Sequence, residues 1–292
     1  MKLLEKFSAP IFNQMAQVIF RFQNVTSFEE YLRKSLTYLE PQSIEEIRTY
    51  ILSQQNDNGA FIDRAGNADI YYSLFGYFLT ETFDLGDVKN SFRKYVNLYQ
   101  PTEDRKNIYL FCQAILSFKL SGKNRESEAQ LEKITHILDT SNPLDDGYSW
   151  FLGVLALFYM EEYFLIKKYL SVWKKNRNPL KENTPASLIA AELVMLKINK
   201  RPCDTHIKLL YKYYRKSGGF VALQKSPVED LLSTAVSLFA LKIAGVSLDI
   251  IKPDSMKFIT SLYYDGGFCA TTFDQEPDIE YTFWGLLALA SI

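Results

Sequence analysis

Residues 265–290, DGGFCATTFDQEPDIEYTFWGLLALA, contain the pattern that decides the fold. Two glycines and Phe268 come first, Asp278 follows ten residues after Phe268, and polar residues nearly vanish from 279 to 290. Glycine permits the positive φ with which many helices end, and aspartate is a preferred residue at a helix start. The stretch therefore predicts the end of one helix, a connecting loop and a second helix that is buried on most sides.

The same pattern recurs along the chain. Glycine-aromatic turns also stand at Gly59-Ala60-Phe61 and at Gly218-Gly219-Phe220. An aspartate begins five apolar stretches, and in four of them an alanine stands ten residues later; these aspartates are Asp69, Asp104, Asp146, Asp230 and Asp278. A weaker sixth copy starts near Thr184-Pro185. Spacings of about 35 to 48 residues fit roughly six pairs of helices joined by loops of variable length.

Amphipathic segments lie between the apolar ones, at 85–99, 128–139, 160–176 and 204–216. Their apolar residues recur every three or four positions, which predicts half-exposed helices. Ser43 and Glu46 have the spacing of a capping box, so the first such helix is expected to begin there. We therefore expect partly exposed and buried helices to alternate in one all-α domain over residues 1–292, with 1–42 as an N-terminal helical extension and repeats over 43–292.

Composition limits the partners and the cellular location. The 292 residues contain 33 Lys and Arg against 34 Asp and Glu, so no broad basic field exists to attract nucleic acid. The three cysteines have no paired spacing, which is typical of a reducing cytoplasm. No secretory signal is expected, and the longest apolar runs are shorter than the roughly 18 residues that span a bilayer. We expect a cytoplasmic protein that is at most membrane-peripheral, and its oligomeric state stays open.

Two features of the repeat resemble a known superfamily. Gln55-x-x-x-Gly59-x-Phe61 is similar to the Gln-x-x-x-Gly-x-Trp repeat of squalene and hopene cyclases. Gly-Gly-Phe followed by Asp230, and again by Asp278, resembles the repeats of protein prenyltransferase β subunits. The resemblance covers about residues 43–292. It implies an (α/α)6 toroid whose inner helices line a central apolar cavity, and a hydrophobic isoprenoid substrate.

The resemblance also implies what chemistry to look for. In zinc prenyltransferases a cysteine ligand follows the aspartate by two residues, and the last repeat supplies a histidine three residues after its aspartate; here Leu232 and Tyr281 stand there. We therefore expect no metal and no cofactor. In class II terpene cyclases the middle aspartate of Asp-x-Asp-Asp protonates the substrate. The corresponding candidates here are Asp104, Asp146 beside Asp145, and Glu280 beside Asp278.

Aromatic residues of the buried stretches are the candidate substrate-binding set. Rings offer an apolar wall to an isoprenoid chain and stabilise a carbocation by about 0.5 to 2 kcal/mol each. The set consists of Tyr72, Phe75, Tyr109, Tyr148, Trp150, Tyr281 and Trp284. The competing interpretation is structural, since the aspartates can act as helix caps and the rings can pack in a core.

Three functions remain open from the sequence. The first is a single-domain, metal-independent cyclase in which a carboxyl group starts a carbocation reaction. The second is a prenyltransferase-like subunit that binds a prenyl diphosphate, with Arg64, Arg105 or Lys106 as contacts. The third is a non-catalytic toroid that binds a lipid or a protein.

Overall fold

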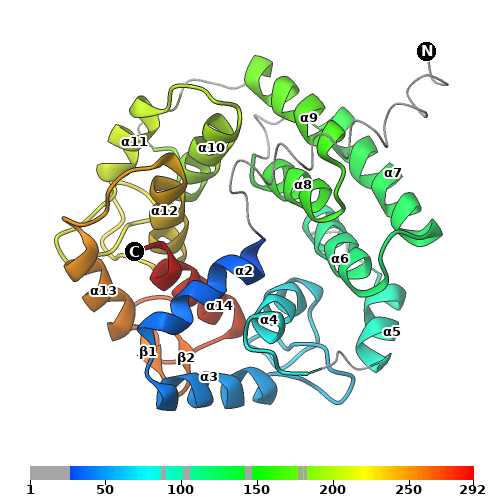
Figure 1. Cartoon of the computed structure of the whole chain (residues 1–292), viewed down its shortest axis with the longest axis horizontal. Coiled ribbons are helices and arrows are strands. Elements are labelled where there is room, and N and C mark those ends of the chain that lie inside the picture. The colour runs from blue at the N-terminus through cyan, green and yellow to red at the C-terminus, as the bar shows by residue number, and fades with distance from the viewer. Residues whose placement is uncertain (1–26, 87–89, 101–105, 142–146, 177–179, 181–182) are drawn as a thin grey trace. The chain divides into compact units, whose positions relative to one another are not determined.

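The computed structural model describes residues 27–86, 90–100, 106–141, 147–176, 180 and 183–292. These residues are mostly helical, with one two-stranded hairpin (Figure 1). The elements in chain order are α2 (Phe28–Leu32), the 3-10 helix η1 (Arg33–Tyr38), α3 (Pro41–Ser53), α4 (Ile70–Thr82), α5 (Asn90–Leu98), α6 (Lys106–Ser121), α7 (Arg125–Thr140), α8 (Gly147–Tyr159), α9 (Tyr163–Asn176), α10 (Ala186–Ile198), α11 (Asp204–Tyr211), α12 (Leu231–Ala244), α13 (Lys252–Ser261), β1 (Tyr263–Tyr264), β2 (Gly267–Phe268) and α14 (Ile279–Ser291). The sequence-based expectation of an all-α fold is confirmed.

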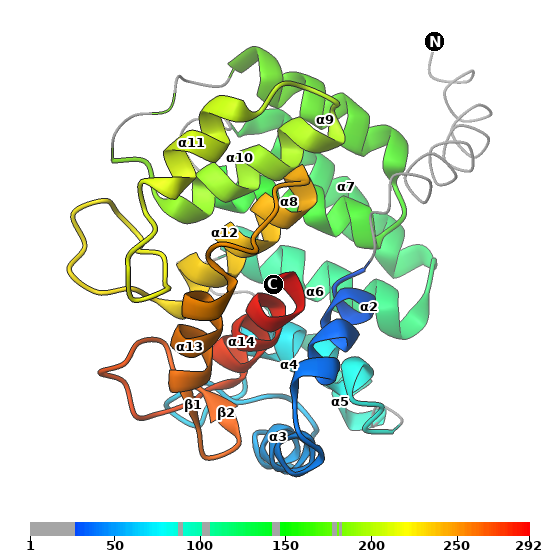
Figure 2. The ribbon, with the colours of Figure 1, turned by 60° about the vertical axis from the view of Figure 1, so that its left-hand side comes forward.

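The chain forms two compact units. Unit 1 comprises residues 1–27 and 89–179, and unit 2 comprises residues 28–88 and 180–292. In unit 2, α10 packs on α12, α12 on α14, and α14 on α4. Outer helices α11, α13 and α3 contact this row, and Figure 2 shows α12, α13 and α14 side by side. In unit 1, α6 packs on α8, while α5, α7 and α9 contact these two helices. Outer and inner helices therefore alternate along the chain, from the pair α3 and α4 to the pair α13 and α14.

The glycine-aromatic turns have the conformation that the sequence predicts. Gly59, Gly218 and Gly266 adopt φ values of 79°, 102° and 80°. A residue with a side chain would be strained there. The phenylalanines that follow, Phe61, Phe220 and Phe268, are almost completely buried. Each turn thus ends an outer helix and places an aromatic ring beneath the next inner helix.

Aspartates cap three inner helices of unit 2, namely α4, α12 and α14. The Asp69 carboxylate accepts hydrogen bonds from the amides of Tyr71 and Tyr72 at 2.7 and 3.0 Å. Asp230 accepts from the amide of Ser233 and Asp278 from that of Tyr281, both at 2.7 Å. The capping interpretation is confirmed at these three positions; Asp104 and Asp146 lie outside the described residues.

Two further positions of the repeat hold the phenylalanine turn against its inner helix. Four residues after each capping aspartate, a Ser or Thr hydroxyl accepts a hydrogen bond from the amide of the preceding phenylalanine; the pairs are Ser73 with Phe61, Thr234 with Phe220, and Thr282 with Phe268. Seven residues after the aspartate stand Gly76 and Gly285. A methyl group added there would lie 2.3 Å from the Phe61 ring or 2.5 Å from the Phe268 ring. These glycines therefore make room for the buried rings.

The expected start of the first outer helix was wrong by two residues. Helix α3 begins at Pro41, and its N-cap, Glu40, makes no side-chain capping bond. Proline suits the first turn of a helix because its fixed φ is helical and its missing N–H would have no partner there. Ser43 and Glu46 therefore lie within the helix. In the described part of the chain, no helix has the length and hydropathy needed to cross a membrane.

Candidate functional site

Each inner helix of unit 2 keeps one face half-exposed. On α12 this face consists of Leu232, Val236 and Phe239. On α14 it begins with Glu280, Tyr281 and Trp284, and on α4 with two tyrosines at 71 and 72. Spacings of three and four residues place such side chains on one side of a helix. The result is a largely apolar and aromatic surface that carries one carboxyl group, that of Glu280.

Aromatic rings from α4 and α14 form a cluster at this surface, around the buried ring of Phe75. The Phe75 ring lies 4.9 Å from that of Tyr71 and 5.5 Å from that of Trp284, between ring centroids. Further along the helices, α2 contributes Phe28 and Tyr31, whose rings lie 5.9 and 5.0 Å from Phe239. Helix α2 thus covers the far part of the surface, and the part near the N-termini of α4 and α14 stays half-exposed.

Glu280 is held by two aromatic hydrogen-bond donors. Its Oε1 atom accepts a hydrogen bond from the Tyr71 hydroxyl at 2.7 Å and another from the Trp284 indole N–H at 3.2 Å. Hydrogen bonds donated to a carboxylate favour its ionised form. This arrangement therefore suits a carboxylate that accepts a proton or stabilises a cation better than one that donates the first proton.

Arg64 connects the loop before α4 to the loop before α14. Its Nε donates to Asp278 and its terminal nitrogen to Asp274, both at 2.7 Å. The guanidinium also lies 5.6 Å from the centre of the Tyr281 ring. The sequence suggested Arg64 as a diphosphate contact, but the structure places it between two carboxylates that offset its charge.

Burial and charge shift several pKa values around Arg64. Burial raises the pKa of Asp278, although the Tyr281 amide and Arg64 oppose this. Burial also opposes ionisation of Asp274, but Arg64 and two backbone amides hold the pKa of that carboxyl below its ordinary value. Burial, and then the nearby carboxylates, raise the pKa of Tyr281 to about 12 and also raise that of Tyr72. Both phenols are therefore neutral near pH 7.

The Arg64–Asp274 pair should make stability depend on pH. Because the folded pKa of Asp274 is lowered, its ionised form stabilises the fold above the unfolded value of about 3.9, and this contribution is lost as the pH falls through the folded value. We expect Asp274→Asn to lower the free energy of unfolding by about 1 kcal/mol at pH 7, with the difference shrinking as the pH falls through the lowered pKa of Asp274. Urea unfolding of both proteins across this range measures it, and a difference independent of pH would contradict the assignment.

The remaining candidate residues from the sequence belong to unit 1 and not to this aromatic surface of unit 2. Trp150 on α8 is 2% exposed and lies edge-on to Tyr169 of α9, which is a core position of unit 1. Tyr109 on α6 is half-buried, with its ring 6.0 Å from that of Tyr99. Tyr148 lies on α8, but its side chain is outside the described part of the structure. Asp104, Arg105 and Asp146 lie outside the described residues altogether. Lys106 is exposed at the start of α6. The structure thus brings together Tyr72, Phe75, Glu280, Tyr281 and Trp284 from the predicted set.

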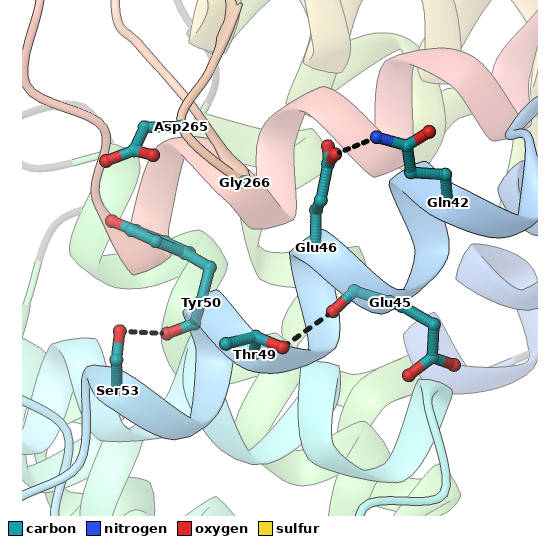
Figure 3. A pocket seen from close by; sticks show the side chains of 8 residues that line it. All are labelled: Gln42, Glu45, Glu46, Thr49, Tyr50, Ser53, Asp265 and Gly266. Atoms are coloured by element: carbon teal, nitrogen blue, oxygen red, sulfur yellow. Dashed lines mark hydrogen bonds between the residues drawn. The ribbon is translucent and has the colours of Figure 1, made fainter.

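A hollow lies on the outside of unit 2, between α3 and the β1–β2 hairpin. It has a volume of about 740 Å³, and Glu45, Glu46, Tyr50 and Asp265 are among its lining residues (Figure 3). Glu46 accepts hydrogen bonds from Gln42 and from the Tyr263 hydroxyl. The Tyr263 contact joins α3 to strand β1 of the hairpin, so Glu46 has a structural role.

One histidine forms a buried side-chain hydrogen bond within unit 2. His206 on α11 lies 3.0 Å from Glu192 on α10, through Nε2 and Oε2. Both side chains are about 10% exposed or less. The two histidines of the chain, His206 on α11 and His136 on α7, both lie on outer helices. The contact fixes an outer helix to an inner one.

Comparison with protein families identifies the architecture. The family model for the prenyltransferase alpha-alpha toroid domain matches residues 30–89 and 186–292, which is more than half of the chain. The chain belongs to this family. No curated protein and no solved structure matches it. The matched toroid-domain segments nearly coincide with unit 2, and they contain all three glycine-phenylalanine turns together with Arg64 and Glu280.

Sequence reasoning missed the partners of Glu280 and of Arg64. A signal for the first was present, because Tyr71 and Glu280 each stand two residues after a capping aspartate. If α4 and α14 are neighbours, equivalent positions of the two repeats meet. The pairing of Arg64 with Asp274 and Asp278 joins residues more than 200 positions apart, and no spacing in the chain indicates it.

Proposed function

We propose that this protein is an isoprenoid-converting enzyme of the metal-independent cyclase type. The observation that carries the proposal is the position of Glu280, a hydrogen-bonded carboxyl among the half-exposed rings of α4 and α14. The aromatic surface would hold the hydrocarbon chain and stabilise positive charge on it. The family relationship supports an isoprenoid-related function.

The proposed reaction begins and ends with a proton transfer. A carboxylic acid protonates an alkene of the substrate, the resulting carbocation forms a ring by attack of a second alkene, and a base then removes a proton to leave a new alkene. Glu280 fits the last step, because Tyr71 and Trp284 stabilise its ionised form. Asp104 and Asp146 remain the candidates for the initial donor. We propose a cytoplasmic location, with contact to a membrane surface where the substrate is found.

A product assay tests this function. Purified protein is incubated with linear isoprenoids of several chain lengths in the presence of a metal chelator, and extracts are analysed by gas chromatography with mass spectrometry. We expect a cyclic isomer of at least one substrate. Conversion that requires added zinc or magnesium would instead favour the prenyltransferase-like alternative. Tight binding without conversion of any substrate would favour a non-catalytic lipid-binding protein.

A further inference from the structure

The loops that precede α4, α12 and α14 are strongly acidic. Residues 62–69, 221–230 and 269–278 contain seven carboxyl side chains and two basic ones, Arg64 and Lys225. Arg64 is already paired with Asp274 and Asp278. Glu280 adds another carboxyl in the first turn of α14. The half-exposed end of the aromatic surface therefore lies in a negative environment.

The N-termini of α4, α12 and α14 offer no compensating site for an anion. A free N-terminus presents amide groups that bind phosphate or carboxylate. In α4, α12 and α14 the capping aspartates already accept these hydrogen bonds, at 2.7 to 3.0 Å. A diphosphate in this place would meet several carboxylates and would find both usual partners, arginine and helix amides, occupied.

Neutral hydroxyl groups are the polar groups that remain for a ligand. Tyr72 and Tyr281 each stand three residues after their capping aspartate, and both are half-buried. Within the described residues neither phenol oxygen forms a hydrogen bond, although Arg64 lies over the Tyr281 ring. A neutral phenol both donates and accepts hydrogen bonds.

We propose, on the basis of the function proposed above, that the substrate is an isoprenoid whose polar end is an uncharged hydroxyl group, hydrogen-bonded by Tyr72 and Tyr281, and not a prenyl diphosphate. The hydrocarbon lies along the half-exposed rings of Tyr71 and Trp284. The carboxylates around Arg64 act in specificity by repelling phosphorylated analogues, because a like charge opposes association.

Equilibrium dialysis with two probes of equal chain length, geranylgeraniol and geranylgeranyl diphosphate, tests the inference. The wild-type protein should bind the alcohol at least about tenfold more tightly than the diphosphate. Equal or tighter binding of the diphosphate would overturn the inference, as would failure of the alcohol to bind. Neither outcome depends on the product assay, so the inference and the proposed function can fail separately.

Three variants test which side chains set the affinities for the alcohol and the diphosphate. Asp274→Asn should raise the diphosphate affinity about threefold or more and leave the alcohol affinity unchanged, because it frees part of the Arg64 charge. Glu276→Gln is the matched control: it removes a carboxylate from the same loop, but this exposed residue makes no contact with Arg64. Tyr281→Phe should weaken alcohol binding about fivefold through the loss of one hydrogen bond and leave the diphosphate unaffected. An unchanged alcohol affinity in this variant would contradict the hydroxyl contact.

Discussion

Glu280→Gln is expected to lower turnover by at least about 100-fold, the usual contribution of a positioned acid or base. Glutamine has nearly the same shape, and its amide oxygen can still accept hydrogen bonds from Tyr71 and Trp284. It cannot accept a proton from a carbocation, so the variant should retain the fold and bind substrate. Steady-state kinetics on the cyclised product measure the effect, with a thermal unfolding curve to confirm an intact structure.

Tyr71→Phe is the matched control for this prediction. It keeps the ring that packs on Phe75 and removes one of the two hydrogen bonds to Glu280. We expect a smaller loss of turnover, about tenfold, together with a shift of the basic group's titration in the pH–rate profile. Turnover within tenfold of wild type in Glu280→Gln would show that another group removes the proton.

Gly285→Ala should lower the free energy of unfolding by about 1 to 3 kcal/mol through overpacking. The added methyl group would lie 2.5 Å from the Phe268 ring. Phe268 is 1% exposed, and its backbone amide is hydrogen-bonded to the Thr282 hydroxyl. Neither the ring nor the helix can move freely. Urea unfolding monitored by circular dichroism measures the change.

Ser237→Ala serves as the comparison at the same position of another repeat. Ser237 stands seven residues after Asp230, as Gly285 does after Asp278, and its hydroxyl is buried without a hydrogen-bond partner in the described structure. Its removal should leave stability unchanged or raise it by about 1 kcal/mol. If both variants lose similar stability, close packing of Phe268 on Gly285 is not the cause.

Much of the fold could be predicted from the sequence because the repeat has local physical causes. The glycine turns require positive φ, the aspartates bind helix amides, and the alternation of apolar and amphipathic stretches separates inner from outer helices. The start of α3 was misplaced because the capping-box spacing of Ser43 and Glu46 competed with Pro41, whose restricted φ decided the helix start. The role of the Ser or Thr four residues after each capping aspartate was missed, because its hydrogen-bond partner is a phenylalanine amide 12 or 14 residues earlier in the chain.

The candidate site could be predicted only in part. Glu280, Trp284, Tyr72 and Phe75 were identified from their places in the repeat, and the structure brings them onto neighbouring faces of α4 and α14. The environment of Arg64 could not be predicted, because it depends on loops from opposite ends of the chain. Arg64 was expected to be a diphosphate contact, but two carboxylates offset its charge in the structure.

Deuterium incorporation tests the central claim, that a protein carboxyl group starts the reaction by protonating a hydrocarbon. Carboxyl protons exchange rapidly with solvent, so turnover in heavy water should give a cyclised product that carries one deuterium, located on the carbon that is protonated first. Mass spectrometry and deuterium NMR of the product measure this. A cyclised product without deuterium, or one formed with release of inorganic diphosphate, would contradict the claim.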